Sequence, residues 1–196
     1  MKYDINLMAM SFCFLAGCSL GVDKQLQQHP EQGTGTIGLK NVRQMAASYY
    51  AVTGVSRTNG NVRNAYNTVA GLFLTDNDVR KVSGPTLIAA TALAGAFCDQ
   101  FLVDEQGRTV GNRMAHNSVN FSAGYASLSE ATRAEVITRY AELFWQRQPL
   151  AEELSMLTGT LSSLYEGISS TSGTEMRRGL LGVCAMMLSS FESIKN

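Results

Sequence analysis

The sequence has little charge and no excess of either sign. Only 16% of its 196 residues are charged, and 16 Lys and Arg balance 16 Asp and Glu. A chain without net charge has no overall field that gathers phosphates, which argues against nucleic acid as its main partner, although a local basic patch remains compatible with this balance. A surface with so few charges is also compatible with other proteins covering part of it.

Residues that commonly hold metals or cofactors are also scarce. There are two histidines, His29 and His116, and a single histidine in the body of the chain is too few for an ordinary zinc site. The C-x-x-C-H sequence of covalent haem attachment does not occur. No stretch alternates polar and apolar residues over the length of a strand. We therefore expect no metal, no cofactor and no β-sheet.

The amino terminus has the features of an export signal. A short polar start with one basic residue, Lys2, precedes an almost wholly apolar run, Ile5–Leu15. This run is too short to cross a bilayer core of about 30 Å, but it has the size of the apolar part of a signal peptide. It ends in Leu15–Ala16–Gly17–Cys18, which resembles a bacterial lipobox. The resemblance implies that residues 1–17 are removed and that Cys18 carries lipid.

The residues after Cys18 predict a durable anchor followed by a tether. Two or more acyl chains hold a protein on a membrane durably, whereas one chain does so only marginally. In the lipoprotein family, a residue other than Asp after the cysteine, here Ser19, implies sorting to the outer membrane of diderm bacteria. Residues 18–38 are polar and rich in Gln and Gly, so they bury too little surface to order themselves. We interpret them as a flexible tether.

One motif in the tether resembles a nucleotide site by pattern only. Gly33–Gly38 matches G-x-G-x-x-G, the dinucleotide-binding fingerprint. That chemistry requires a buried strand before the glycines and a helix after them. The preceding residues, Gln27–Gln32, are polar and contain Pro30, so we interpret the motif as flexible linker.

Residues 39–196 predict an all-α domain, an irregular bundle of about six helices. Caps followed by apolar residues at spacings of three and four recur along it, with helices introduced by Asn59 or Asn61, by Ser83, by the capping boxes Ser127–Glu130 and Ser172–Glu175, and after Pro149. The last helix is expected to run to about Ile194. The leucines between Leu150 and Ile168 form an apolar seam, for which core packing is the default and a docking face the alternative.

The most apolar predicted helix contains one of the two cysteines that remain after processing. Thr86–Cys98 is small or apolar all round, which places it in the middle of a bundle. Cys13 leaves with the signal and Cys18 is lipidated, so Cys98 and Cys184 remain, each on an apolar helix face in an oxidising compartment. We predict a Cys98–Cys184 disulfide; the alternative is two buried free thiols.

A long polar connection, residues 106–124, follows that helix. Bundles usually connect neighbouring helices with two to eight residues, and longer loops are often functional. The segment contains Arg108, Arg113, His116 and Phe121, and we predict that these form part of a partner-facing surface. Catalysis at His116 is a weaker alternative, because no spacing places a nucleophile and a carboxylate beside it. Asp99, Asp104 and Glu105 end the preceding helix, where each should lie in water or meet a base such as Arg108 or Arg113.

Residues 143–191 resemble a known kind of domain. LFWQRQPLAEEL, followed by CAMMLSSFES, is similar to paired helices in uncharacterised helical domains of bacterial envelope proteins, some attached to cytochromes. The similarity transfers no residue role.

Three functional hypotheses follow. The leading one is a non-enzymatic lipoprotein, anchored at Cys18 and bound to another envelope protein as an assembly component. The second is a periplasmic or surface module that holds a small molecule between helices or under the 106–124 loop. The third is an enzyme with a site near that loop. An aromatic-lined cavity with convergent polar groups would favour the second, and an exposed apolar patch the first.

Overall fold

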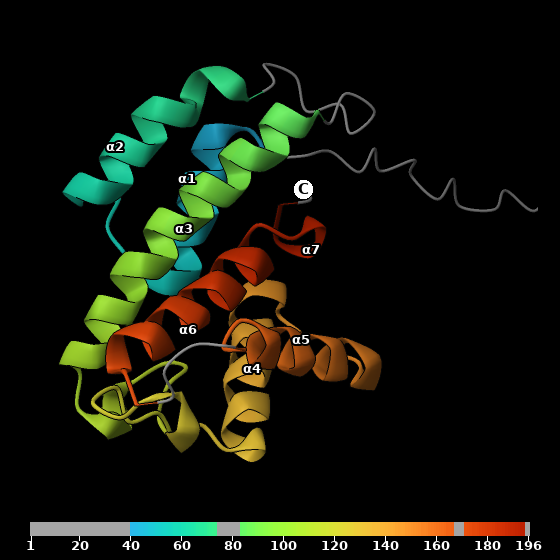
Figure 1. The fold of residues 1–196 in the computed structure, drawn as a ribbon. Helices are drawn as coiled ribbons and strands as arrows, with labels where there is room; N and C mark the ends of the chain where they lie inside the picture. The colour runs from blue at the N-terminus through green and yellow to red at the C-terminus, as the bar shows by residue number, and fades with distance from the viewer. Residues whose placement is uncertain (1–39, 74–82, 167–170, 195–196) are drawn as a thin grey trace, which may run out of the picture. The chain divides into compact units, whose positions relative to one another are not determined.

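The computed structural model describes residues 40–73, 83–166 and 171–194, and within these ranges the fold is all-α, as predicted. The signal peptide, Cys18 and the tether lie outside the described residues. The elements, shown in Figure 1, are α1 (Val42–Thr53), α2 (Gly60–Val69), η1 (Ala70–Leu72), α3 (Gly84–Gly107), η3 (Val110–Asn112), η4 (Tyr125–Ser127), α4 (Glu130–Trp145), α5 (Ala151–Ser163), α6 (Gly173–Leu188) and α7 (Phe191–Ile194).

Local capping sets most of the helix ends. Asn41 caps α1 by accepting a hydrogen bond from the Gln44 backbone, and the Gln44 side chain accepts from the Asn41 backbone. The helix stops at Gly54, whose φ of 71° is costly for residues with a Cβ. Asn59 caps α2, and Ser83 caps α3 with Pro85 in its first turn. The starts of α2 and α3 agree with the predicted caps, Asn59 and Ser83.

Helix α3 is the centre of the bundle. It packs against α1, α2 and α6, and its small buried side chains, such as Ala89, Ala90 and Ala94, allow these neighbours to come close (Figure 1). By length and composition alone α3 is apolar enough to cross a membrane, but half of its apolar window is buried inside the protein, as in the core helix of a bundle. It extends to Gly107, just past Glu105, the last of the acidic residues that were expected to end it.

The predicted cysteine pair is present in the structure. Cys98 on α3 and Cys184 on α6 are joined, with their Cα atoms 5.9 Å apart, and both side chains are fully buried. The bond closes a separation of 86 residues, so it ties the central helix to the carboxy-terminal part of the fold.

Helices α4 to α7 form the other part of the bundle, where α4 packs on α5, α6 and α7. Trp145, at the end of α4, donates its indole N–H to the Ser190 hydroxyl at 2.9 Å. The Tyr165 hydroxyl donates to the Met176 carbonyl of α6, and a Cβ at Gly179 would come within 2.2 Å of the Tyr165 ring. Gly179 therefore allows the segment after α5 to close on α6.

Two predicted helix boundaries are wrong. The cap of α4 is Ser129 and not Ser127, because the Ser129 hydroxyl accepts from Thr132 while Ser127 lies in the turn η4 and donates to the Gly124 carbonyl. The last helix does not run unbroken to Ile194: α6 ends at Leu188 and α7 begins at Phe191. Ser189 and Ser190 bond to carbonyls of the last turn of α6, which satisfies its end locally.

Candidate functional site

A buried polar cluster holds the 106–124 loop to the bundle. The Glu105 carboxylate lies at the end of α3 and accepts hydrogen bonds from the backbone N–H groups of Met114 at 2.9 Å and Ala115 at 2.9 Å. It also meets His116 Nδ1 at 3.0 Å, and His116 Nε2 lies 2.7 Å from the Tyr140 hydroxyl of α4. Glu105, His116 and Tyr140 are each 0% exposed. The cluster therefore joins α3, the loop and α4.

The protonation states in this cluster follow from its surroundings. Burial alone would raise the pKa of Glu105, but hydrogen bonds from His116 and from the Ala115 and Met114 backbone outweigh it and lower that pKa to about 2. Burial lowers the pKa of His116, although Glu105 opposes this effect. Burial, with a smaller contribution from the Glu105 charge, raises the pKa of Tyr140. At neutral pH Glu105 is thus ionised, while His116 is neutral and Tyr140 keeps its proton.

These states give each hydrogen bond one direction. An ionised carboxylate only accepts, so His116 carries its proton on Nδ1 and donates to Glu105. Its Nε2 then accepts from the Tyr140 hydroxyl. A carboxylate that orients an imidazole is also found in general-base sites. Here the second ring nitrogen is occupied by a buried tyrosine, and none of the three side chains reaches solvent in this conformation.

The structure corrects the predicted partner-facing loop. His116 is fully buried and Phe121 nearly so, with both rings in contact at a centroid distance of 5.4 Å. Arg113 lies over the Phe121 ring at 5.0 Å and donates to the Val119 carbonyl at 2.7 Å. Of the four residues predicted to face a partner, Arg108 and Arg113 are partly exposed, and Arg108 is paired with Glu105 at 2.8 Å. The prediction is wrong for His116 and Phe121, which are core residues.

The acidic end of α3 is only partly as expected. Glu105 does meet Arg108, but it is buried and not in water. Asp99 pairs with Arg177 of α6 at 2.6 Å, and Asp104 accepts from Gln100 at 2.8 Å. The Asp99–Arg177 pair is a contact that the linear spacing did not indicate.

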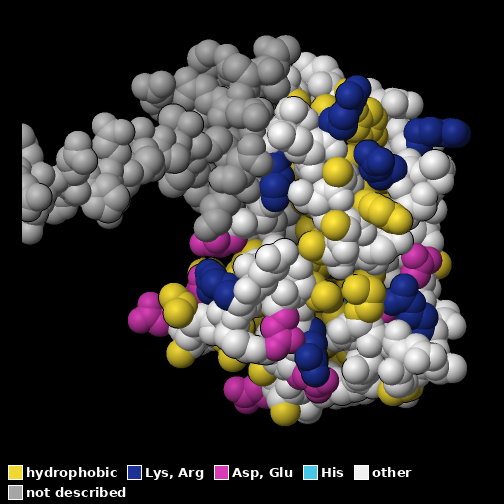
Figure 2. Space-filling view, turned by 180° about the vertical axis from the view of Figure 1, so that it is seen from behind, with side chains coloured by type: hydrophobic (Ala, Val, Ile, Leu, Met, Phe, Trp, Pro, Cys, Tyr) yellow, Lys and Arg dark blue, Asp and Glu magenta, His cyan; other side chains and the backbone are white. Residues whose placement is uncertain are grey.

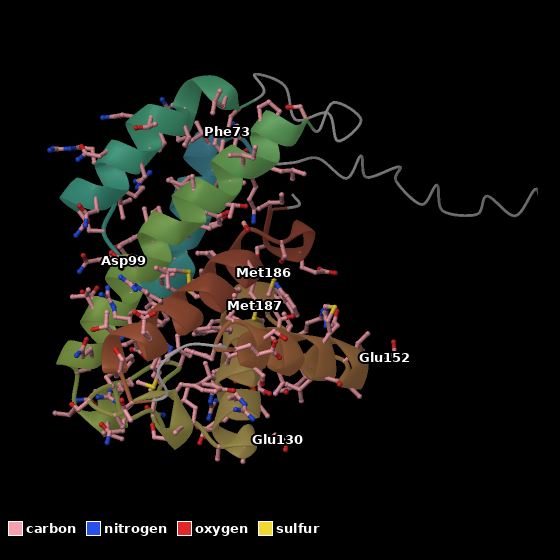
Figure 3. The ribbon with its side chains drawn as sticks, viewed as in Figure 1. Phe73, Asp99, Glu130, Glu152, Met186 and Met187 are labelled. Atoms are coloured by element: carbon pink, nitrogen blue, oxygen red, sulfur yellow. A yellow bond between two sulfur atoms is a disulfide. The ribbon has the colours of Figure 1, made fainter. Side chains whose placement is uncertain are left out.

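A surface groove lies where α5, α6 and the end of α4 meet. We call it the methionine groove; its volume is about 300 Å³, and it is lined by Trp145, Glu153, Met156, Leu157, Met186, Met187, Ser190 and Glu192. Met156 is 64% exposed and Met186 38% exposed, whereas Leu157 and Met187 are buried beneath them. Figure 3 labels Met186 and Met187 on α6, beside α5.

Charged side chains border this groove on one side. Arg147 lies over the Trp145 ring at 5.1 Å and donates to both carboxylate oxygens of Glu153 at 2.7 Å. It also lies 3.8 Å from Glu192. The groove thus has an apolar floor and a border in which opposite charges are already paired with each other.

The leucine seam that contains part of this groove is neither wholly core nor wholly surface. Leu157 and Leu161 are buried, as the default interpretation predicts, while Leu150 and Leu164 are exposed. Ile168 lies outside the described residues. Met156, adjacent to buried Leu157, is exposed, and the spacing of apolar residues along α5 did not indicate this.

Other hollows in the described part of the chain are more open or more polar. One lies between α4 and α5, and another beside the loop is lined by Gln106, Phe121, Gly173, Thr174 and Arg177. Within the described ranges, no group of three or more His, Cys, Asp or Glu is placed to hold a metal ion. No protein-family model, curated protein or solved structure matches this chain at a significant level.

Proposed function

We propose that this protein is a lipid-anchored component of the bacterial envelope that binds a helix of another protein in the methionine groove. The lipobox Leu15–Ala16–Gly17–Cys18 supports the anchor, and Ser19 supports an outer-membrane location. The exposed apolar groove between α5 and α6 supports the binding role and is the observation that carries it.

The chemistry of the groove suits an apolar helix face. Methionine is flexible and polarisable, so a surface with Met156 and Met186 adapts to irregular partner side chains. An amphipathic helix lays its apolar side into such grooves. Trp145, partly covered at the base of the groove, belongs to the residue types that dominate binding energy at interfaces.

The border of the groove supports specificity more than affinity. Arg147, Glu153 and Glu192 are close enough to share charge, so a partner does not have to neutralise an isolated ion on arrival. Interfaces commonly combine an apolar centre with a polar rim of this kind. The proposal therefore predicts weak dependence on salt and strong dependence on the methionines.

Substitution at the groove tests the binding role. In the lipidated protein purified from its native envelope, Met156→Glu with Met186→Glu should reduce partner recovery after crosslinking by roughly 30-fold, as expected for a lost hot spot of about 2 kcal/mol. The matched control is Val103→Glu with Val110→Glu, which places two acids at exposed apolar positions on α3 and η3. Equal recovery of both variants, at unchanged helicity, would place partner binding elsewhere.

The anchor has a separate test. Cells grown with a palmitate analogue should label the wild-type protein and leave Cys18→Ala unlabelled. Equal labelling of both would remove the lipoprotein proposal without bearing on the groove. Small-molecule binding and enzyme activity stay as the alternative predictions.

A further inference from the structure

The first described segment of the chain is basic, although the whole chain is neutral. Between residues 32 and 75 there is no Asp or Glu, while Lys40, Arg43, Arg57 and Arg63 all fall within this stretch. These residues belong to the start of the described fold, α1, α2 and the turn between them. Figure 2 shows Lys and Arg side chains gathered on one part of a molecular face with no Asp or Glu among them.

The three arginines of this stretch surround one hollow. We call it the basic groove; its volume is about 400 Å³, and it is lined by Arg43, Ala46, Arg57, Thr58, Val62, Arg63, Tyr66 and Asn67. Ala46 and Val62 are buried and give it an apolar floor, and Tyr66 is half-buried at its side. The groove therefore combines a positively charged rim with apolar depth.

The arginines of this groove differ from all others in the described part of the chain. Seven arginines, at positions 108, 113, 133, 139, 147, 177 and 178, make an ion pair or donate to a carbonyl or hydroxyl. Among the described residues, Arg43, Arg57 and Arg63 have no such partner. Three like charges around one hollow repel one another unless an anion from outside neutralises them.

The backbone from which these side chains extend is held in place before any ligand arrives. Arg43 lies in the first turn of α1, fixed by the Asn41 cap, and Arg63 lies in the first turns of α2, fixed by the Asn59 cap. Arg57 lies in the turn between them, where the Ser56 and Thr58 hydroxyls are bonded at 2.7 Å. The Asn59 side chain also donates to Gln100 of α3 at 3.0 Å, which ties the turn to the central helix.

We propose that the basic groove binds the phosphate groups of an anionic membrane surface. The guanidinium fork matches phosphate oxygens better than an ammonium does, and each basic residue near an anionic bilayer strengthens attraction to it. Tyrosine is enriched at membrane–water interfaces, where its ring lies at headgroup level. A membrane is favoured over a dissolved anion because this segment follows the tether directly, a point that rests on the proposed lipid anchor. The groove would orient the domain on the membrane that the anchor reaches.

A vesicle assay on the full chain carrying Cys18→Ala tests this proposal without an acyl group. Vesicles of phosphatidylcholine alone measure any insertion of the apolar leader, and vesicles that also contain phosphatidylglycerol measure attraction to anionic headgroups. The chain should partition more strongly to the anionic vesicles, and added salt should reduce the difference.

Two matched variants locate the binding surface. Arg57→Gln with Arg63→Gln should weaken partition to the anionic vesicles by roughly 30-fold, since each lost basic residue near the surface is worth about fivefold. Arg139→Gln with Arg178→Gln removes the same charge from exposed positions on α4 and α6 and should change partition less than about twofold. Circular dichroism should show the same helicity for both.

Three results would overturn the proposal. Equal losses in the two double variants would mean that only net charge matters. Equal partition of the unsubstituted chain to neutral and anionic vesicles would mean that the groove does not bind an anionic membrane surface. Full displacement from anionic vesicles by millimolar glycerol phosphate would assign the groove to a dissolved phosphate ester. Failure of the lipid-labelling test alone would leave the headgroup result standing.

Discussion

The 106–124 loop and the α5–α6 face differ from what their compositions suggest: the polar loop contributes side chains to the core, and the apolar face leaves side chains exposed. The loop is polar and glycine-containing, yet it places His116 and Phe121 in the core. The α5–α6 face carries leucine and methionine, yet Met156 is among the most exposed large apolar side chains of the described residues. Composition reports what a segment is able to bury, but the internal partners of its polar atoms decide what it does bury.

The physical reason for the difference is the carboxylate at the end of α3. Glu105 supplies acceptors for the backbone donors of Met114 and Ala115 and for the His116 ring, so Ala115 and His116 in a polar loop are buried with these donors satisfied. No comparable requirement applies to Met156, whose thioether needs no hydrogen-bond partner in water or in an interface.

Removing the charge of Glu105 should have the largest effect. Glu105→Gln replaces one acceptor with an N–H₂ group that faces other donors, and breaking a buried pair of this kind costs about 3–5 kcal/mol. Urea denaturation should show this loss. Glu135→Gln, at an exposed site of α4, should change stability by less than about 0.5 kcal/mol. Similar values for the two would mean that the loop does not depend on Glu105.

Adjacent residues of α5 should separate core from surface. Leu157 is 3% exposed, so Leu157→Ala should cost about 2–5 kcal/mol in the free energy of unfolding. Met156→Ala should cost less than about 0.5 kcal/mol, because its side chain is mostly in solvent. The same denaturation measurement decides both, and a large loss for Met156→Ala would assign the methionine to the core.

We expect the disulfide to contribute somewhat less to the free energy of unfolding than Glu105 or Leu157. Cys98→Ala with Cys184→Ala should lower stability by about 2–4 kcal/mol, since the bond restricts the unfolded chain. Intact mass before and after alkylation of native exported protein checks the bond itself. Two thiols that alkylate freely without reduction would contradict it.

We expect acidification to lower the free energy of unfolding gradually. Because the pKa of His116 is lowered in the fold from its ordinary 6.5, the unfolded chain binds the extra proton first, so stability is complete above about pH 6.5 and falls below it. Glu105, with a folded pKa of about 2 against 4.5, adds a second loss between those values. One proton changes stability by at most about 1.4 kcal/mol per pH unit. His116→Gln should flatten the pH profile near pH 6, and an unchanged slope would contradict a neutral buried His116.

Much of the fold could be predicted from short-range sequence patterns, whereas less of the candidate site could. Asn59, Ser83 and Ser172 mark helix starts because their side chains bond the nearby backbone, a relation that sequence spacing expresses directly. The Cys98–Cys184 pair followed from eliminating the other two cysteines.

The buried cluster was missed because its partners are separated along the chain. A usable signal was present: Phe97, Phe101 and Glu105 recur every four residues, so Glu105 shares the buried stripe of α3 and required an internal partner. Which side of α5 faces solvent was not available from spacing, because apolar residues occur on more than one side of it. The Arg43, Arg57 and Arg63 cluster was similarly masked by the neutral total charge.

Photocrosslinking at two positions, one in each of two proteins, tests most directly whether the partner protein contacts the methionine groove and not the 106–124 loop. A photoreactive amino acid at position 156 and, in a second protein, at position 110 probes the groove and the exposed tip of η3, respectively. Irradiation in the native envelope should give one discrete adduct from position 156, abolished by Met186→Glu, and none from position 110. A discrete adduct from position 110 with none from position 156 would contradict the account.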